Sequence, residues 1–266
     1  MKKILFRIFI VLLILYILFC IGFYLFQEKL IFYPQKLDEN YQFSFDQRYE
    51  ELNIKTQDGL FLNSFLFKAD STKGVIIFLH GNAGALDTWG QLAPFYIEQN
   101  YDILFFDYRG FGKSDGKIEN QSQLFCDVQT VYDTIRAKYS EDRITIIGYS
   151  IGTGPAAYLA SNNNPQKLIL IAPYYSLTNV IQSICPVMPK FLIKYKLETY
   201  KYISDCSMPV TIFHGNKDQV IDYENSVMLD NLLSAKGNLI SIEGVGHNDI
   251  LVNEAYKRNV REVLAK

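Results

Sequence analysis

Residues 144–160 read ITIIGYSIGTGPAAYLA, and this stretch decides the fold. It begins with a short apolar run, Ile144–Ile147, and ends in alanine-rich sequence that is typical of a helix. Between the two lies GYSIG, a G-x-S-x-G motif whose serine is Ser150. Glycines on both sides of the serine remove the side chains that would clash in a tight strand-to-helix turn. The stretch therefore predicts a strained turn that exposes Ser150 at the carboxyl end of a buried strand.

Similar apolar runs recur on both sides of this unit, separated by segments long enough for helices. They are Val75–Leu79, Ile103–Phe106, Leu168–Ile171, Val210–Phe213 and Leu239–Ile242. Continuous rather than alternating apolar runs indicate strands buried on both faces, and their spacing indicates right-handed βαβ units. Ahead of them, Tyr49–Thr56 and Leu60–Phe67 alternate around Asp58-Gly59, which favours a hairpin. We therefore predict an α/β fold with a mostly parallel, eight-stranded sheet that starts antiparallel.

One stretch interrupts this rhythm, because residues 173–204 separate the sixth and seventh predicted strands and are too long for a simple crossover. Pro186 and Pro189 would end any helix inside it. We expect a small cap over the carboxyl edge of the sheet, with an apolar wall toward a ligand; the alternative is that its apolar side chains only attach the cap to the core. The candidate wall residues are Tyr174, Tyr175, Val187, Met188, Phe191 and Leu192.

The segment Ile8–Phe26 carries no charged side chain. At about 1.5 Å per residue, a helix over it reaches roughly 28 Å, close to the ~30 Å hydrocarbon core of a bilayer. A cleaved signal peptide would have a shorter apolar stretch and small residues at its exit, whereas residues 23–26 are bulky. We predict a membrane anchor over residues 1–29 and one domain over residues 30–266, with 173–204 as a cap insertion.

The charges around the predicted anchor indicate its orientation. Lys2, Lys3 and Arg7 precede the apolar segment, whereas Glu28 and Lys29 cancel after it. The positive-inside rule then places the N-terminus in the cytoplasm and the domain on the other side of the membrane.

The overall composition excludes several classes of protein. Apolar residues make up 49% and aromatic residues 15% of the chain, which excludes disorder. Lys and Arg total 26 against 28 Asp and Glu without a long run of one sign, so no nucleic-acid partner is expected. The 4 cysteines form neither a C-x-x-C pair nor the spacing of a zinc site. We therefore expect neither a metal nor another cofactor.

A serine hydroxyl becomes a nucleophile when a base removes its proton. Of the 3 histidines, only His247 lies in a glycine-rich loop after the last predicted strand, so His247 is the predicted base for Ser150. His80 and His214 both precede glycine at the end of a strand. For these two we expect buried, hydrogen-bonded positions and no catalytic role.

The base needs a carboxylate that orients it, and the reaction needs two backbone amides that face the developing oxyanion. Asp218 follows the seventh strand and completes the chain order Ser, Asp, His, so we favour it as the acid. Asp222 and Asp249 remain the alternatives. For the oxyanion hole we predict the amide of Ile151, directly after the nucleophile, and that of Asn82, in the loop after the third strand.

With these parts in place, the chain resembles membrane-anchored α/β-hydrolases, relatives of lysophospholipases, monoacylglycerol lipases, protein depalmitoylases and enzymes named serine aminopeptidases. The resemblance begins near Leu30 and runs to the C-terminus. Besides the serine turn, it rests on LIFYP at 30–34, HGNAG at 80–84, DYRGFGKS at 107–114, HGNKD at 214–218 and GHND at 246–249. The resemblance implies that 107–114 is a structural loop near the site, so Arg109 is not assigned a catalytic role.

The motifs predict a serine hydrolase that cleaves an acyl ester or thioester through an acyl-enzyme. A lipid-like substrate is expected because the anchor and the apolar cap bring the site near a bilayer; within the cap we single out Tyr174, Tyr175, Met188 and Phe191 for substrate binding. One alternative is an aminopeptidase, which needs a cap carboxylate to hold an amine and has only Glu198 and Asp205 as candidates. The other is a non-catalytic binding protein on the same fold, which typically lacks a triad residue.

Overall fold

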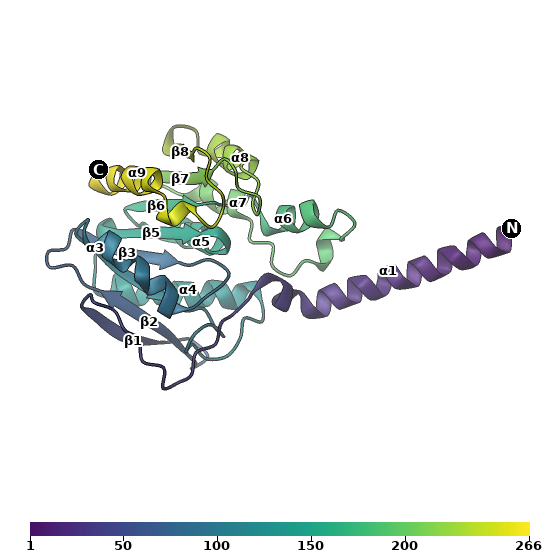
Figure 1. Ribbon diagram of the computed structural model, residues 1–266, viewed down its shortest axis with the longest axis horizontal. Coiled ribbons are helices and arrows are strands. Elements are labelled where there is room, and N and C mark those ends of the chain that lie inside the picture. Colours follow the sequence, from purple (N-terminus) through teal and green to yellow (C-terminus); the bar gives the residue numbers. More distant parts are fainter.

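The computed structural model describes the backbone of residues 1–266 and every side chain except that of Ser234. Eight strands form one sheet in the order β1-β2-β4-β3-β5-β6-β7-β8 (Figure 1). They are β1 (Tyr49–Lys55), β2 (Phe61–Phe67), β3 (Gly74–Leu79), β4 (Tyr101–Phe106), β5 (Ile144–Tyr149), β6 (Lys167–Ile171), β7 (Val210–Gly215) and β8 (Gly237–Ile242). Strand β2 pairs antiparallel with β1 and β4, and all other pairs are parallel. The predicted sheet is confirmed.

Helices cover both faces of this sheet (Figure 1). They are α2 (Leu86–Trp89), α3 (Ala93–Ile97), α4 (Gln121–Arg136), α5 (Thr153–Asn162), α6 (Leu177–Ile184), α7 (Thr199–Asp205), α8 (Glu224–Leu233) and α9 (Glu254–Ala265). One core layer contains buried side chains of α4, α5, α7 and α8, and the other contains those of α2, α3 and α9. On β3, Val75 and Ile77 pack in the first layer and Ile76 and Phe78 in the second, which explains the continuous apolar run.

The connections of β3 and β5 create the place for a site. Strand β3 leads into α2 and α3 on one face of the sheet, whereas its neighbour β5 leads into α5 on the other face. Such a reversal opens a crevice at the carboxyl ends of the two strands, which is where α/β sheets bind ligands.

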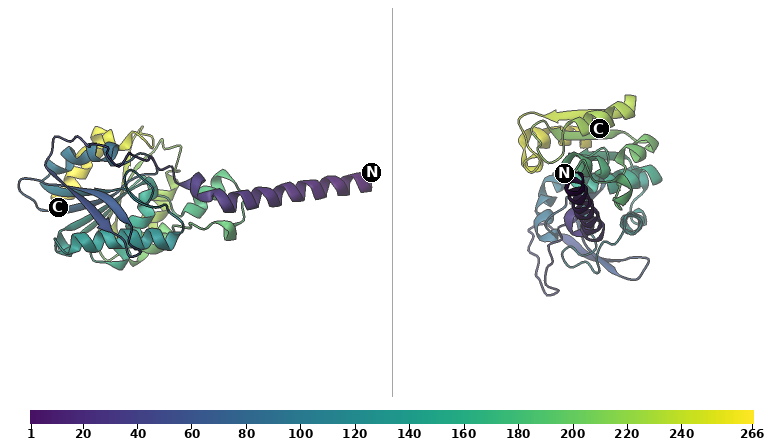
Figure 2. Two further views of the ribbon diagram at one scale, coloured as in Figure 1. Left: turned by 90° about the horizontal axis from the view of Figure 1, so that it is seen from below. Right: turned by 90° about the vertical axis from the view of Figure 1, so that its right-hand side faces the viewer.

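Helix α1 (Lys2–Ile31) extends from this body as a long apolar rod (Figure 1, Figure 2). Its most apolar window has a mean hydropathy of 3.1, and only 6% of that window is buried within the protein. The helix is thus long and apolar enough for membrane anchoring. Its last turn differs, because Gln27 and Ile31 are buried against the body.

The segment between β6 and β7 contains two helices that behave differently. Helix α6 is capped by Ser176, whose Oγ accepts a hydrogen bond from the Asn179 amide at 3.1 Å, and it ends at Ile184, before Pro186. It projects from the sheet toward α1 (Figure 1). Helix α7 returns to pack against α5. Only the first half of the expected cap therefore stands away from the sheet.

Candidate active site

The turn between β5 and α5 holds Ser150 in a strained conformation. Its φ of +52° lies in the left-handed region, which costs of the order of 1–3 kcal/mol for a residue with a side chain. A Cβ atom at Gly152 would lie 2.3 Å from the carbonyl oxygen of Leu79, and one at Gly148 would lie 2.6 Å from Cβ of Ala156. Both glycines are therefore required by close packing around the serine.

Ser150, His247 and Asp218 meet at the carboxyl edge of the sheet, after β5, β8 and β7 respectively. The His247 ring lies with Nδ1 2.6 Å from Oδ2 of Asp218 and Nε2 2.9 Å from Oγ of Ser150. With the proton on Nδ1, the ring donates to the carboxylate, and Nε2 is free to accept the serine proton. All three side chains are buried. This is the arrangement of nucleophile, base and orienting acid that acyl transfer needs.

The Asp218 carboxylate is fixed by several donors. Its Oδ1 accepts hydrogen bonds from the amides of Val220 and Ile221 at 2.8 and 2.9 Å, and its Oδ2 also lies 3.2 Å from Nε2 of His214. Burial by itself raises the pKa of Asp218, but the hydrogen bonds from His214, His247 and the Ile221 amide outweigh it and hold the pKa below its usual range. The group therefore stays ionised beside the histidine.

His214 supports the acid from the side opposite His247. It is fully buried, and its Nδ1 lies 2.5 Å from Oγ of Ser226. The sequence predicted its burial but missed its contact with Asp218, which the four-residue spacing within HGNKD makes possible. The alternative acid, Asp222, instead accepts a hydrogen bond from the Glu224 amide at the start of α8.

The two predicted oxyanion donors belong to the same hollow as Ser150, because Asn82 and Ile151 both line it. Within the described residues, no backbone hydrogen bond uses the Asn82 amide, which leaves this donor for a ligand. The Asn82 side chain accepts a hydrogen bond from the Tyr33 amide at 3.3 Å. Tyr33, in the segment after α1, thus contacts the loop after β3 that carries the predicted oxyanion donor Asn82.

A cavity of about 580 Å³ opens over Ser150, which is within the usual size range for small-ligand sites. Much of its apolar wall comes from four parts of the chain. Among the wall residues are Leu30 and Ile31 of α1, Ala83, Trp89 and Leu92 of the segment after β3, Leu177, Val180, Ile181 and Ile184 of α6, and Val220, Ile221, Leu251 and Val252 of the loops around the triad. No group of three His, Cys, Asp or Glu side chains in the described part of the chain is placed to hold a metal ion.

Of the predicted substrate-binding residues, Tyr174 lines this cavity. Its hydroxyl also donates to the carbonyl oxygen of Ile151 at 2.9 Å and accepts from the Gly154 amide at 3.1 Å. Tyr174 therefore also stabilises the backbone directly after Ser150, through Ile151 and Gly154.

The other three predicted substrate-binding residues lie away from the cavity. Tyr175 stacks on Tyr200 with ring centroids 4.6 Å apart, Met188 is buried within the cap, and Phe191 is 83% exposed beside α1. The wall differs from the expected one because α6 turns its own apolar face toward Ser150, whereas the loop after it turns away. Leu30 and Ile31 were not predicted to line the cavity, although the LIFYP motif at 30–34 was a signal for them.

Comparisons with known proteins identify relatives of the chain. A family model described as serine aminopeptidase, S33, matches residues 70–201. Alpha/beta hydrolase domain-containing protein 17B of Xenopus laevis is 31% identical over 202 residues, which cover 74% of this chain and 68% of that protein. The 17C protein of the same organism is 29% identical over 240 residues, covering 86% and 75%. An esterase of Pyrococcus furiosus shares the fold, with a TM-score of 0.71 and 20% identity over 88% of this chain and 97% of the esterase.

Proposed function

Since the chain belongs to the α/β-hydrolase family of alpha/beta hydrolase domain-containing protein 17B, we propose that it is a serine hydrolase of acyl esters or thioesters. The observation that carries this proposal is the Ser150–His247–Asp218 alignment beneath an apolar cavity. A hydrogen-bonded serine and histidine supply a nucleophile, and the apolar wall suits an acyl chain.

In the proposed reaction, Nε2 of His247 takes the Ser150 proton while Oγ attacks the acyl carbonyl carbon. The amides of Ile151 and Asn82 stabilise the oxyanion, each by about 3–4 kcal/mol. The histidine then gives its proton to the departing alcohol or thiol, which leaves an acyl-enzyme. Water, deprotonated by the same histidine, attacks this ester and releases the acid.

The lining of the cavity favours an acyl substrate over a peptide amine. An aminopeptidase needs a carboxylate near the nucleophile, and the described lining residues include no Asp or Glu. Glu198, one of the two candidates from the sequence, pairs with Lys201 at 2.9 Å. We therefore retain the lipid-like acyl substrate as part of the proposal and set the peptidase alternative aside.

The first test is activity-based labelling of the full chain in detergent with a fluorophosphonate probe. Ser150→Ala and His247→Ala are expected to abolish labelling and hydrolysis of a short p-nitrophenyl ester while the far-UV circular dichroism stays unchanged. Asp218→Asn is expected to lower kcat by about 10⁴-fold because the histidine loses its orienting carboxylate. Asp222→Asn is the matched control and should stay near wild type. Substantial turnover by Ser150→Ala contradicts the proposal.

The substrate class is tested with esters from acetyl to dodecanoyl. Each methylene that enters the apolar cavity contributes about 0.8 kcal/mol, or about fourfold in kcat/KM. We expect kcat/KM to rise through medium chains, and Ile181→Asp to flatten that rise. The control Leu232→Asp, on an exposed position of α8, should leave it unchanged. A maximum at acetyl would exclude a lipid-like substrate.

We propose that α1 spans the membrane with its N-terminus in the cytoplasm, because Lys2, Lys3 and Arg7 lie at that end. Sealed vesicles with the cytoplasmic side outward test this orientation. Added protease should leave the hydrolase domain intact until detergent opens the vesicles. Digestion without detergent would reverse the assignment.

A further inference from the structure

Residues 185–193, here called the cap loop, lie alongside the membrane-anchor helix. The Tyr16 hydroxyl donates to the carbonyl oxygen of Val187 at 2.8 Å, although the two residues are 171 positions apart in sequence. The loop and one side of α1 enclose an apolar groove of about 370 Å³. Its lining residues are Tyr16, Ile17, Cys20, Ile21, Tyr24, Leu25, Pro189, Phe191 and Leu192. The ribbon diagrams show the segment that follows α6 beside α1 (Figure 1, Figure 2).

The outer side of this region is apolar and exposed. Ile184, Val187 and Phe191 have exposed fractions of 79%, 64% and 83%. Large apolar side chains that gather on a surface mark a site of contact with a membrane or a partner. Here the three side chains extend the exposed apolar surface of α1, so we expect the loop and the helix to lie in the same apolar environment.

The backbone of the cap loop is satisfied in part from within the protein, which lowers the cost of contact with an apolar medium. The amides of Met188, Leu192 and Ile193 donate to carbonyl oxygens of the loop itself at 3.0, 3.0 and 3.2 Å. The Gln182 side chain donates to the Met188 carbonyl oxygen at 3.3 Å. Pro186 and Pro189 have no amide hydrogen to satisfy. The amides of Val187, Lys190 and Phe191 have no backbone partner within the described residues, so the loop suits the interfacial part of a leaflet, where free amides still meet water and lipid head groups.

Gln27 fixes the depth of the loop relative to α1. This side chain is fully buried, its Nε2 donates to the Leu192 carbonyl oxygen at 3.1 Å, and its Oε1 accepts from the Lys194 amide at 2.8 Å. An ion pair of 3.1 Å between Glu28 and Lys194 lies next to it. These polar contacts mark the end of the apolar surface that α1 and the cap loop form together. From Gln27 to Tyr16, the loop accompanies about three turns of the helix, or roughly 16 Å.

The active-site cavity opens toward the same junction. Leu30 and Ile31 of α1 line it from one side, and Ile181 and Ile184 of α6 line it from the other. Ile184 is also the last residue of α6, directly before the cap loop. The apolar wall over Ser150 is therefore continuous with the exposed apolar surface of the loop.

We propose that the cap loop enters the phospholipid leaflet beside α1, and that acyl chains reach Ser150 laterally from that leaflet, between α1 and α6. The inference rests on the anchoring and the acyl hydrolysis proposed above. A leaflet rather than a protein partner is the occupant because the exposed side chains extend the surface of the anchor itself.

The position of the loop is tested without catalysis, with the full chain in phosphatidylcholine vesicles. Phe191→Trp adds one indole to the native Trp89, and lipids with a doxyl group on the acyl chain quench an indole that lies among them. The added emission should be quenched several-fold more strongly than that of Leu232→Trp, the matched exposed position on α8. Equal quenching at the two positions overturns the proposal.

Lateral entry is tested with Val187→Asp and Phe191→Asp. Turnover of a long-chain ester embedded in vesicles should fall at least tenfold, whereas turnover of a water-soluble short ester should stay within twofold, and Leu232→Asp should change neither. An equal loss on both esters, or no loss on either, contradicts lateral entry. A wild-type chain that hydrolyses no ester refutes the proposed function instead, and leaves the quenching result standing.

Discussion

His80 and Asp107 form a buried pair just outside the triad. Both side chains are fully inaccessible, and their nearest atoms, Nε2 and Oδ1, are 3.6 Å apart, too far for a hydrogen bond. Burial lowers the pKa of His80 to about 4 and raises that of Asp107 to about 8. Both groups are therefore uncharged near neutral pH.

This pair predicts how stability depends on pH. Between pH 4 and 6.5, Asp107 is protonated in the native state and ionised in the unfolded state. In the same range, His80 is neutral in the native state and protonated in the unfolded state. The native and unfolded states therefore bind equal numbers of protons at these two residues, and their effects on stability cancel. Between pH 6.5 and 8, only Asp107 remains, the native state binds more protons, and stability falls as pH rises. The slope is at most about 1.4 kcal/mol per pH unit.

Asp107→Asn should remove this decline, as measured by thermal unfolding of the full chain in detergent at several pH values. Asp115→Asn, in the same loop but with no burial comparable to that of Asp107, is the control and should keep the wild-type slope. A variant that loses stability from pH 6.5 to 8 as steeply as the wild type would show that Asp107 is ionised in the native state.

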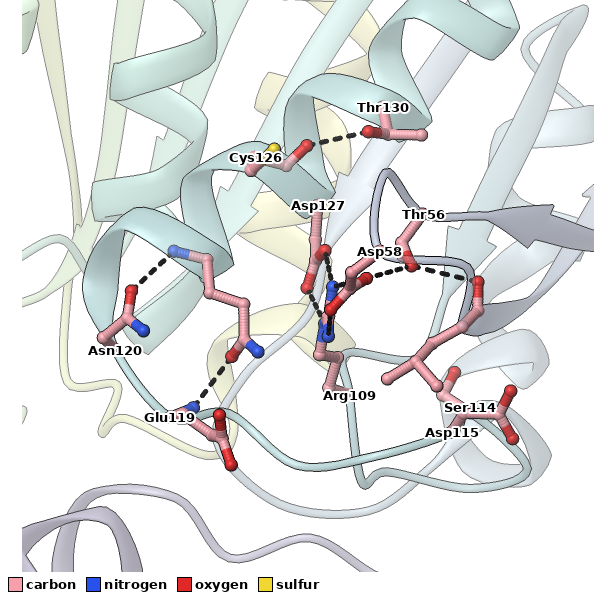
Figure 3. A network of polar contacts seen from close by, with 12 residues as sticks. Thr56, Asp58, Arg109, Ser114, Asp115, Glu119, Asn120, Cys126, Asp127 and Thr130 are labelled. Carbon is pink, nitrogen blue, oxygen red and sulfur yellow. Dashed lines mark hydrogen bonds and ion pairs between the residues drawn. The ribbon is translucent and has the colours of Figure 1, made fainter.

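At the scale of elements, a buried arginine joins the antiparallel start of the sheet to a helix of the parallel part. Arg109, in the loop after β4, makes paired hydrogen bonds of 2.6 and 2.7 Å with Asp58 in the β1–β2 turn and with Asp127 on α4 (Figure 3). The arginine and Asp127 are 4% and 5% exposed, whereas Asp58 is 53% exposed. The arginine thus has a structural position, and it lies outside the cavity over Ser150.

Asp127→Asn should lower the free energy of unfolding by about 3 kcal/mol, toward the lower end for a broken buried pair because Arg109 keeps its second partner. In a chain of this size that corresponds to a fall in Tm of the order of 6–12 °C. Asp58→Asn should cost much less, because water already solvates that carboxylate. Differential scanning fluorimetry of both variants checks the order. A larger loss for Asp58→Asn would contradict this account.

At the scale of the whole molecule, helix α1 and the hydrolase body together form the wall of the cavity over Ser150. The last turn of α1 supplies Leu30 and Ile31 to the cavity and Gln27 to the cap loop, and Phe32 packs edge to face on Tyr195 at 5.2 Å. Helix α1 is therefore apolar and exposed over most of its length, and at its end it lines the cavity over Ser150.

Truncation separates these two roles. A chain that begins at Gln27 should lose tight membrane association but keep hydrolysing a short soluble ester, because the triad and the wall remain. A chain that begins at Pro34 should lose most of that activity, since the cavity loses one side and Gln27 no longer holds the cap loop. Centrifugation with vesicles and ester turnover measure the two effects. Equal activity of the two chains would show that the end of α1 plays no part in the site.

The sheet, the serine turn and the chain order of the candidate triad could be predicted from local sequence patterns. Continuous apolar runs are a local consequence of burial on both faces, and the glycines around Ser150 are a local consequence of a tight turn. Chain order then assigned His247, because strands of a parallel sheet place their following loops at one edge.

Local patterns could not predict which carboxylate meets the histidine or what forms the wall of the cavity. Asp218 and Asp222 are four residues apart in the same loop. The path of the loop decides which of the two carboxylates reaches the histidine, so the sequence favoured Asp218 without excluding Asp222. Aromatic residues of the cap were expected over Ser150, but α6 and the end of α1 line the cavity together. Their residues are more than 140 positions apart, and no local pattern specifies an arrangement over such separations.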